Sequence, residues 1–134
     1  MAKGFEQNQE HKRALHALGK DLARRARSKC ELSHARGVPL VTYEIPPIPE
    51  YPELDRCLLV SQPVFEQLTK TPKFRPDEWR HLNDLVWSDH PGTQVMALRV
   101  LRFLAPNHPW AQQILEDVYP EPEIDEWAEA SPLA

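Results

Sequence analysis

Residues 77–104 read DEWRHLNDLVWSDHPGTQVMALRVLRFL and carry the densest apolar periodicity in the chain. Apolar side chains recur there at three- and four-residue steps on both sides of a polar turn, SDHPG, as in two amphipathic helices. They are Trp79, Leu82, Val86, Val95, Leu98 and Leu101. Pro91 suits the first position of a helix, where its missing N–H would have no partner. The segment therefore predicts helices over residues 76–87 and 91–104, and it places the core between them.

Further helices are expected on both sides of this pair. Residues 6–27 contain no proline and place Leu15, Leu18, Leu22 and Ala26 on one face, which predicts an amphipathic helix that Gly19 weakens. Residues 64–68 predict a short helical turn, residues 109–118 predict a third helix after the polar turn, and a last one is expected around Trp127.

Two short strands are predicted between the N-terminal helix and this helical part. Residues 38–45 alternate, with Val41, Tyr43 and Ile45 on one face, and residues 57–61 can pair with them until Pro63. Four prolines in residues 46–52 favour an extended connector between the strands. The fold class is therefore α+β, mostly helical, with one two-stranded unit. A single domain is expected over residues 1–134: a basic helix (1–29), the two-stranded part (30–68) and a helical part (76–129).

The composition limits the class of protein. The 134 residues suffice for one core, with 41% hydrophobic and 27% charged residues. No run approaches the ~20 apolar residues that cross a bilayer, and residues 1–13 do not read as a signal segment. We therefore expect a cytoplasmic protein without a membrane partner. Cys30 and Cys57 are too few for a disulfide scaffold.

Charge is divided unevenly along the chain. Through Arg36 there are nine Lys and Arg against four Asp and Glu, and the remainder has seven against sixteen. Basic residues crowd the end of the first predicted helix: Lys20, Arg24, Arg25, Arg27 and Lys29. They complement the partial negative charge of a helix C-terminus, as a solvated face would. The alternative is a phosphate-contacting surface of a nucleic-acid-binding module.

Several short runs carry a family resemblance. They are SKCELSH at residues 28–34, VTYEIPP at 41–47, WRHLND at 79–84, Trp87-Ser88, Gln94-Val95 and WAQ at 110–112. In these runs, and in their order, the chain resembles the N-terminal zinc-ribbon part of the PhnA-like family, once named alkylphosphonate-utilisation proteins. The resemblance covers about residues 15–127, and it implies a zinc-ribbon or treble-clef-like knuckle with two C-x-x-C pairs.

Most of the metal ligands that the resemblance implies are missing. The four ligand positions are occupied by Cys30, Ser33, Val60 and Pro63, so only the first keeps its cysteine. A structural zinc ion takes four thiolate or imidazole ligands, so one remaining cysteine does not make a site. We expect a metal-free ribbon without a cofactor. A rebuilt zinc site of Cys30, His34 and Cys57 is the alternative.

The knuckle also resembles treble-clef nucleases of the HNH type, whose strand ends in H-H-I-x-P and whose histidine activates water. The corresponding run is TYEIP at residues 42–46, so the histidine is absent. Glu44 could replace it as a base, although a surface acid or a salt-bridge partner is the simpler interpretation. His81 and His90 flank the central turn, with Asp84 and Asp89 nearby. The pair His81 and Asp84, three residues apart, is best interpreted as a helix-surface hydrogen bond rather than as a metal or acid/base site.

Two further features bear on nucleic-acid binding. The four tryptophans, at positions 79, 87, 110 and 127, are interpreted as core packing rather than as a base-stacking platform. As a helix-turn-helix, the central pair of helices would offer Arg99 and Arg102, with Thr93 and Gln94, to a DNA groove. The acidic surroundings disfavour that docking.

These sequence features leave three candidate functions. The favoured one is a non-catalytic interaction module that binds an unknown protein partner through an apolar or acidic surface. The second is a nucleic-acid-binding module that uses the basic N-terminal helix. A phosphonate-related hydrolase comes last, because only the family's name suggests it and no catalytic residue is predicted.

Overall fold

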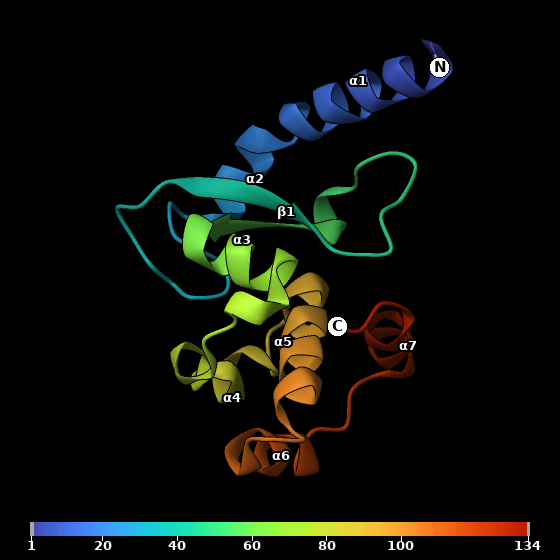
Figure 1. Cartoon of the computed structure of the whole chain (residues 1–134). Helices are drawn as coiled ribbons and strands as arrows, with labels where there is room; N and C mark the ends of the chain where they lie inside the picture. Colours follow the sequence, from blue (N-terminus) through green and yellow to red (C-terminus); the bar gives the residue numbers. More distant parts are fainter. Residues whose placement is uncertain (1, 134) are drawn as a thin grey trace.

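The computed structural model describes residues 2–133, with side chains from residue 8 onward. It is an α+β fold, mostly helical, with one small antiparallel sheet (Figure 1). The helices are α1 (Ala2–Ala17), α2 (Gly19–Ala26), α3 (Gln62–Thr69), α4 (Leu82–Leu85), α5 (Pro91–Leu104), α6 (Pro109–Glu116) and α7 (Pro122–Ala130). The strands are β1 (Leu40–Glu44) and β2 (Cys57–Ser61), and short 3-10 turns lie at Leu54–Arg56, Thr71–Lys73 and Pro76–Trp79.

Helices α4, α6 and α7 lie around α5, and the sheet lies at one end of it (Figure 1). Helix α2 packs on β2, α3 packs on both strands, and α4, α6 and α7 pack on α5. Helix α1 extends away from this body at the sheet end, while α6 lies at the opposite end (Figure 1). One cluster of buried side chains runs from Cys30 to Ala128 and joins the sheet to the helices.

Helix α5 confirms the predicted bounds 91–104. Pro91 stands in its first turn, and the ring Nδ1 of His90 accepts a hydrogen bond from the Thr93 N–H at 3.3 Å, which satisfies one orphan donor of the helix start. Most residues of α5 are buried, including Val95, Leu98 and Leu101. A helix that is buried around most of its circumference belongs at the centre of a fold.

The sheet confirms the predicted pairing of the two strands. They run antiparallel from the pair Leu40↔Ser61 to the pair Glu44↔Cys57. β2 has the predicted bounds, and β1 is shorter than the predicted residues 38–45. The ladder stops at Ser61 because that residue caps α3, where its hydroxyl accepts from the Val64 N–H at 3.5 Å.

The prediction of one N-terminal helix over residues 6–27 is wrong. The helix breaks at Leu18, whose N–H bonds the Leu15 carbonyl three residues back, and α2 begins at Gly19. Glycine makes such a break cheap because it has little helix propensity. The break turns Leu22 and Ala26 of α2 into the core, while α1 keeps only a half-buried face with His11, Ala14 and Leu15.

The prediction of one helix over residues 76–87 is also wrong. A 3-10 turn, Pro76–Trp79, is followed by the one-turn helix α4. Two side chains are fixed by different elements there. The Trp79 indole N–H donates to Gln67 Oε1 at 2.8 Å, and the His81 ring is bonded to the Leu32 carbonyl at 2.5 Å. A regular helix cannot satisfy both anchors, so tertiary contacts override the helical periodicity.

Three of the four tryptophans pack as predicted. Trp79 is buried, and Trp110 and Trp127 are half-buried against the core. Trp87 is 60% exposed, so its assignment to the core is wrong. Among residues 2–133, no helix combines the length and the apolar character that crossing a bilayer requires.

Candidate functional site: a cleft between helix α1 and the proline-rich connector

The segment before β1 folds into a tight knuckle around Cys30. The Cys30 N–H bonds the Ala35 carbonyl at 2.9 Å, and the His34 N–H bonds the Cys30 carbonyl at 2.8 Å. His34 has a positive φ of 65°, and the Ser33 N–H points at the Cys30 sulfur at 3.2 Å. The chain thus folds back on itself, with the thiol of Cys30 turned into the core.

The two thiols are in different electrostatic surroundings. Burial by itself raises the pKa of Cys30, but hydrogen bonds from the Ser33 side chain and from the backbone of Ser33, Ser61 and Leu32 outweigh burial and lower it. Burial, with Glu44 nearby, raises the pKa of Cys57 to about 11. Both cysteines are free and buried.

The vestigial and rebuilt metal positions are not gathered into one site. Val60 is fully buried in β2, and Pro63 is exposed in the first turn of α3. Over the described part of the chain, no three His, Cys, Asp or Glu side chains form a group that could hold a metal ion. The structure therefore does not bring Cys30, His34 and Cys57 together as ligands.

The predicted basic cluster divides into two environments. Lys20, Arg24 and Arg27 are exposed, and Lys29 is half-buried. Arg25 turns inward, where it is paired with the Glu31 carboxylate at 3.0 Å and donates to the carbonyls of Leu54 and Cys57. Arg25 is thus a structural residue and is not available to a phosphate group.

Both arginines of the helix-turn-helix alternative are engaged by α7. Arg99 is 2% exposed and donates to the carbonyls of Trp127 and Ala128 at the end of α7. Arg102 is paired with Asp125, which also belongs to α7. Because α7 covers this side of α5, the helix cannot enter a DNA groove in this arrangement.

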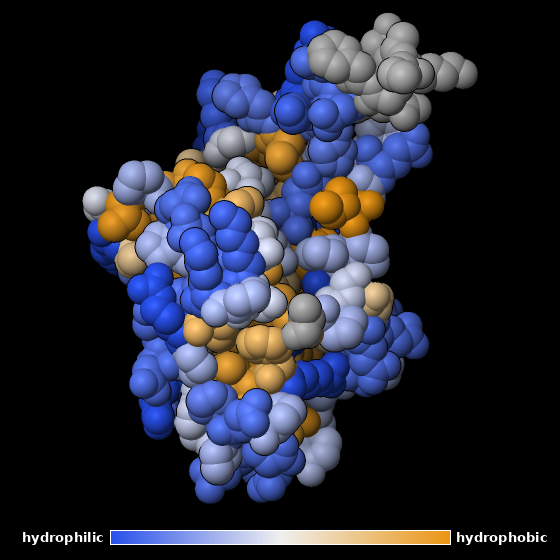
Figure 2. Space-filling model, in the orientation of Figure 1, coloured by the Kyte–Doolittle hydropathy of each residue, from blue (hydrophilic) through white to orange (hydrophobic). Residues whose placement is uncertain are grey.

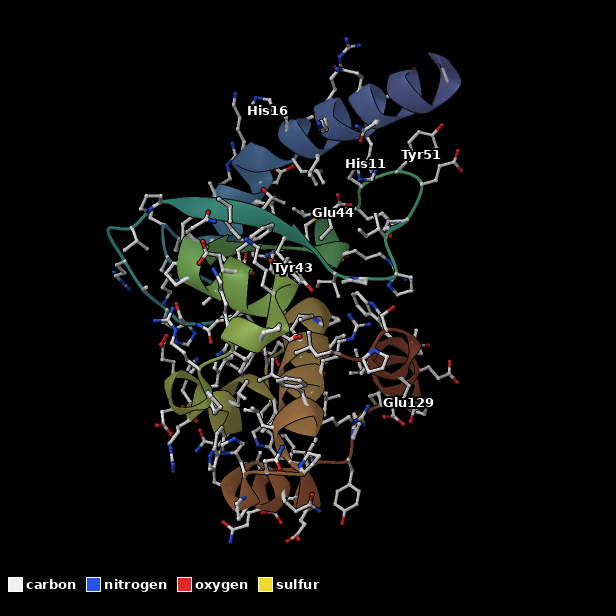
Figure 3. The ribbon with its side chains drawn as sticks, viewed as in Figure 1. His11, His16, Tyr43, Glu44, Tyr51 and Glu129 are labelled. Atoms are coloured by element: carbon white, nitrogen blue, oxygen red, sulfur yellow. The ribbon has the colours of Figure 1, made fainter. Side chains whose placement is uncertain are left out.

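An open cleft lies between α1 and the connector from β1 to β2. Its volume is about 460 Å³. The side chains that line it come from α1, from the end of β1 and from the connector: Asn8, Glu10, His11, Glu44, Ile48, Pro49, Glu50 and Tyr51. Figure 3 shows His11 on α1 and Tyr51 on the connector at the two sides of this region, with Glu44 below.

His11 and Glu44 join the two walls of the cleft. The His11 Nε2 lies 2.7 and 2.9 Å from the two carboxylate oxygens of Glu44, and its Nδ1 lies 3.3 Å from the Glu50 carbonyl oxygen. The hydrogen bond with Glu44 is the main cause that raises the pKa of His11, with burial opposing it and the Glu50 carbonyl adding to it. Both partners are acceptors, so the imidazolium form satisfies them at once.

The pair bears on the interpretation of Glu44. This carboxylate is a salt-bridge partner of His11, which agrees with the interpretation of Glu44 as a salt-bridge partner rather than a catalytic base. Both ring nitrogens of His11 are engaged, so the ring has no free lone pair that could accept a proton from a substrate. The arrangement joins two chain segments and does not resemble a poised general base.

Large apolar side chains are exposed on the connector wall. Ile48 is 58% exposed and Tyr51 is 70% exposed. By contrast, the visible surface over the described part of α1 is mainly hydrophilic (Figure 2). Exposed isolated apolar residues are common, but two of them on one loop beside a cleft form a local feature of the kind found at binding sites.

Sequence reasoning missed this cleft. His11 and Glu44 are 33 positions apart, and neither the spacing nor the residue types predict that they meet. Only the connector gave a signal, because the prolines around Ile48 and Tyr51 prevent regular structure that would bury them.

Comparison of the chain with protein-family models, with curated proteins and with solved structures finds no match.

Proposed function

We propose that the protein is a non-catalytic interaction module that binds a protein partner in the cleft between α1 and the connector. The observation that carries the proposal is the exposure of Ile48 and Tyr51 beside a cleft of about 460 Å³. Tyrosine is enriched at protein interfaces because its ring offers a large apolar area together with a polar tip. The engaged ring of His11 supports a binding role over a catalytic one.

We further propose that the scaffold is a PhnA-like ribbon that has lost its metal. The knuckle around Cys30, the β1–β2 hairpin and α3 follow one another in the order that the family resemblance implies. Core packing of Leu32, Leu58 and Val60 takes the place of metal ligation in this proposal. The free thiols support a cytoplasmic location, where cysteines stay reduced.

Selection from a phage-displayed random peptide library tests the interaction module. Wild-type protein is the bait, and the enriched peptides are then measured against an Ile48→Ser/Tyr51→Ser variant, without prior removal of any phage. We expect enriched peptides whose affinity for the double variant is at least about tenfold lower, since two apolar anchors are lost. A Tyr119→Ser variant is the matched control, because Tyr119 is 87% exposed but lies between α6 and α7.

The proposal fails if no peptide depends on the cleft. That result would be either an unenriched library or peptides that bind the wild type and the Ile48→Ser/Tyr51→Ser variant equally well. Circular dichroism of each variant checks the fold, which surface substitutions of this kind should leave intact.

A second candidate is nucleic-acid binding, favoured by the exposure of Lys20, Arg24 and Arg27 on and just after α2. Fluorescence anisotropy with duplex DNA and single-stranded RNA, across a salt series, compares the wild type with a triple alanine variant of these residues. If all three contact phosphates of duplex DNA, the slope of log K against log salt should become shallower by about 2.7. The control is a Lys70→Ala/Lys73→Ala variant, because both lysines are exposed and lie outside α2. Absence of salt-dependent binding would exclude this candidate.

A further inference from the structure

We propose that the cleft takes an extended segment in which an arginine side chain lies beside an aliphatic one. This inference rests on the proposed function and adds the chemistry of the partner to it. It combines two properties of the lining residues: uncompensated negative charge and an exposed apolar wall.

The charge argument begins with the carboxylates. Glu10, Glu44 and Glu50 line the cleft, and His11 is the one basic residue among the lining side chains. His11 is paired with Glu44. Within residues 8–133, the ion pairs include neither Glu10 nor Glu50. The cleft therefore offers two carboxylates to a cation, and complementary charge directs such a partner to this face.

The apolar argument selects the kind of cation. Ile48 and Tyr51 project from the connector next to Pro49, so a bound cation lies beside apolar surface. An arginine side chain suits that environment, because its planar guanidinium binds a carboxylate in a fork and also stacks on an aromatic ring. A neighbouring aliphatic side chain would cover Ile48.

The size argument selects an extended segment. A volume of about 460 Å³ lies within the range of about 300–1,000 Å³ that is typical of small-ligand sites. Such a cleft holds a few side chains, whereas a docked helix needs a longer groove. The partner therefore enters through a short segment of its chain.

The test is an NMR titration of ¹⁵N-labelled protein with three capped peptides. The first alternates leucine and arginine, the second has citrulline for arginine, and the third has glutamate. Citrulline keeps the shape of arginine without its charge. We expect the arginine peptide to shift the amide signals of Ile48, Glu50, Tyr51 and His11, and to bind about tenfold more tightly than the citrulline peptide. The glutamate peptide should bind least.

Substitutions on the protein complete the test. A Glu10→Gln/Glu50→Gln variant should bind the arginine peptide about tenfold more weakly, while its affinity for the citrulline peptide should stay the same. The matched control is Glu121→Gln/Glu123→Gln, which removes two exposed carboxylates at α7 and should change neither affinity.

Three outcomes overturn the inference. They are equal binding of the arginine and citrulline peptides, no effect of Glu10→Gln/Glu50→Gln, and a loss of binding in the α7 control. If cleft-dependent peptides from the phage selection lack basic residues, the proposed function stands and this inference fails. If the selection yields no cleft-dependent peptide, the proposed function fails first.

Discussion

Arg24 and Arg25 are adjacent residues with opposite environments. The side chain of Arg24 is 81% exposed and lies 3.9 Å from Asp21, whereas that of Arg25 is 23% exposed and is paired with Glu31, itself 9% exposed. Arg25 also donates to two backbone carbonyls, of Leu54 and Cys57. It therefore ties α2 to the knuckle and to the start of β2.

Replacing Arg25 should destabilise the protein. In an Arg25→Ala variant the largely buried carboxylate of Glu31 loses its partner, and two carbonyls lose a donor. We expect the free energy of unfolding to fall by about 2–3 kcal/mol, somewhat less than for a fully buried pair because Arg25 is partly exposed. Urea denaturation measures the change. Arg24→Ala is the control and should stay within about 0.5 kcal/mol of wild type. Equal effects of the two substitutions would contradict the structural role of Arg25.

His11 should titrate with Glu44. Its pKa is raised above 6.5 in the folded protein, so the pair is fully formed below the unfolded value and is lost as the pH rises through the folded one. NMR of the histidine ring signals measures this pKa. In a Glu44→Gln variant the charge of the partner is gone, and the pKa of His11 should fall toward 6.5.

A Glu53→Gln variant is the control for this titration. Glu53 is an exposed acid of the connector that is paired with Arg56, and its loss should leave the titration of His11 unchanged. If His11 titrates identically in the wild type and in Glu44→Gln, the two side chains are not joined in solution.

At the scale of the elements, α5 is held close to the sheet by a glycine. A Cβ at Gly92 would lie 2.8 Å from Ile45 Cδ1 and 3.2 Å from the Asp55 carbonyl oxygen. Ile45 is fully buried and cannot easily move. The first turn of α5 therefore packs so closely on the end of β1 and on the turn before β2 that a side chain at position 92 would overlap its neighbours.

Alanine substitution at two glycines tests this packing. Gly92→Ala should lower the free energy of unfolding by about 1–3 kcal/mol, because an extra carbon overpacks the core. Gly19→Ala has no atom within 4 Å of its new Cβ and should raise stability by about 0.5 kcal/mol, because alanine favours the helix. Thermal and urea unfolding give both values. Equal stabilities of the two variants would mean that α5 packs less closely than described.

A buried arginine joins α7 to α5. Arg99 donates to the carbonyls of Trp127 and Ala128, at 2.6 and 3.2 Å, and so satisfies two of the acceptors that the end of a helix leaves open. Arg56 stacks on the Trp127 ring, with its guanidinium carbon 4.7 Å from the ring centroid. Burial lowers the pKa of Arg99 from its ordinary value, yet an arginine keeps its charge at neutral pH.

For the whole molecule, the division of charge along the chain becomes a division in space. The basic segment forms α1 and α2 at the sheet end, while α6 lies at the opposite end (Figure 1). The acids of residues 116–129 thus lie on and between α6 and α7. The basic and acidic segments thus form different elements, although α7 packs beside α5 and meets Arg56 next to the sheet.

Hydrogen exchange should follow this arrangement. Amides of α5, which has the most buried side chains, should exchange most slowly and report global unfolding. Amides of residues 8–17 in α1 should exchange much faster, because only one face of that helix is half-buried. Mass spectrometry or NMR measures both rates. A Glu44→Gln variant should speed exchange in α1 and leave α5 unchanged.

Protection of α1 equal to that of α5 would contradict this expectation, and it would show that the contact between His11 and Glu44 is part of a larger interface. The control is Glu53→Gln, which should change neither rate.

The sequence by itself determined the elements whose signals are local. The apolar period and Pro91 predicted α5 with its observed bounds, the run from Cys57 to Ser61 predicted β2, and the fold class followed from these elements. A helix or strand of this kind depends on its own side chains and backbone groups, which are all visible in a short window of sequence. The exposed connector was also foreseeable, since proline prevents regular structure.

Only the tertiary structure decided the features that depend on distant partners. The inward turn of Arg25, the joining of His11 to Glu44 and the interrupted helix at Trp79 each require a residue from another element. Such contacts form because the core brings the elements together, and no spacing within one segment encodes them. The cleft is therefore a property of the fold, whereas α5 and β2 follow from local sequence.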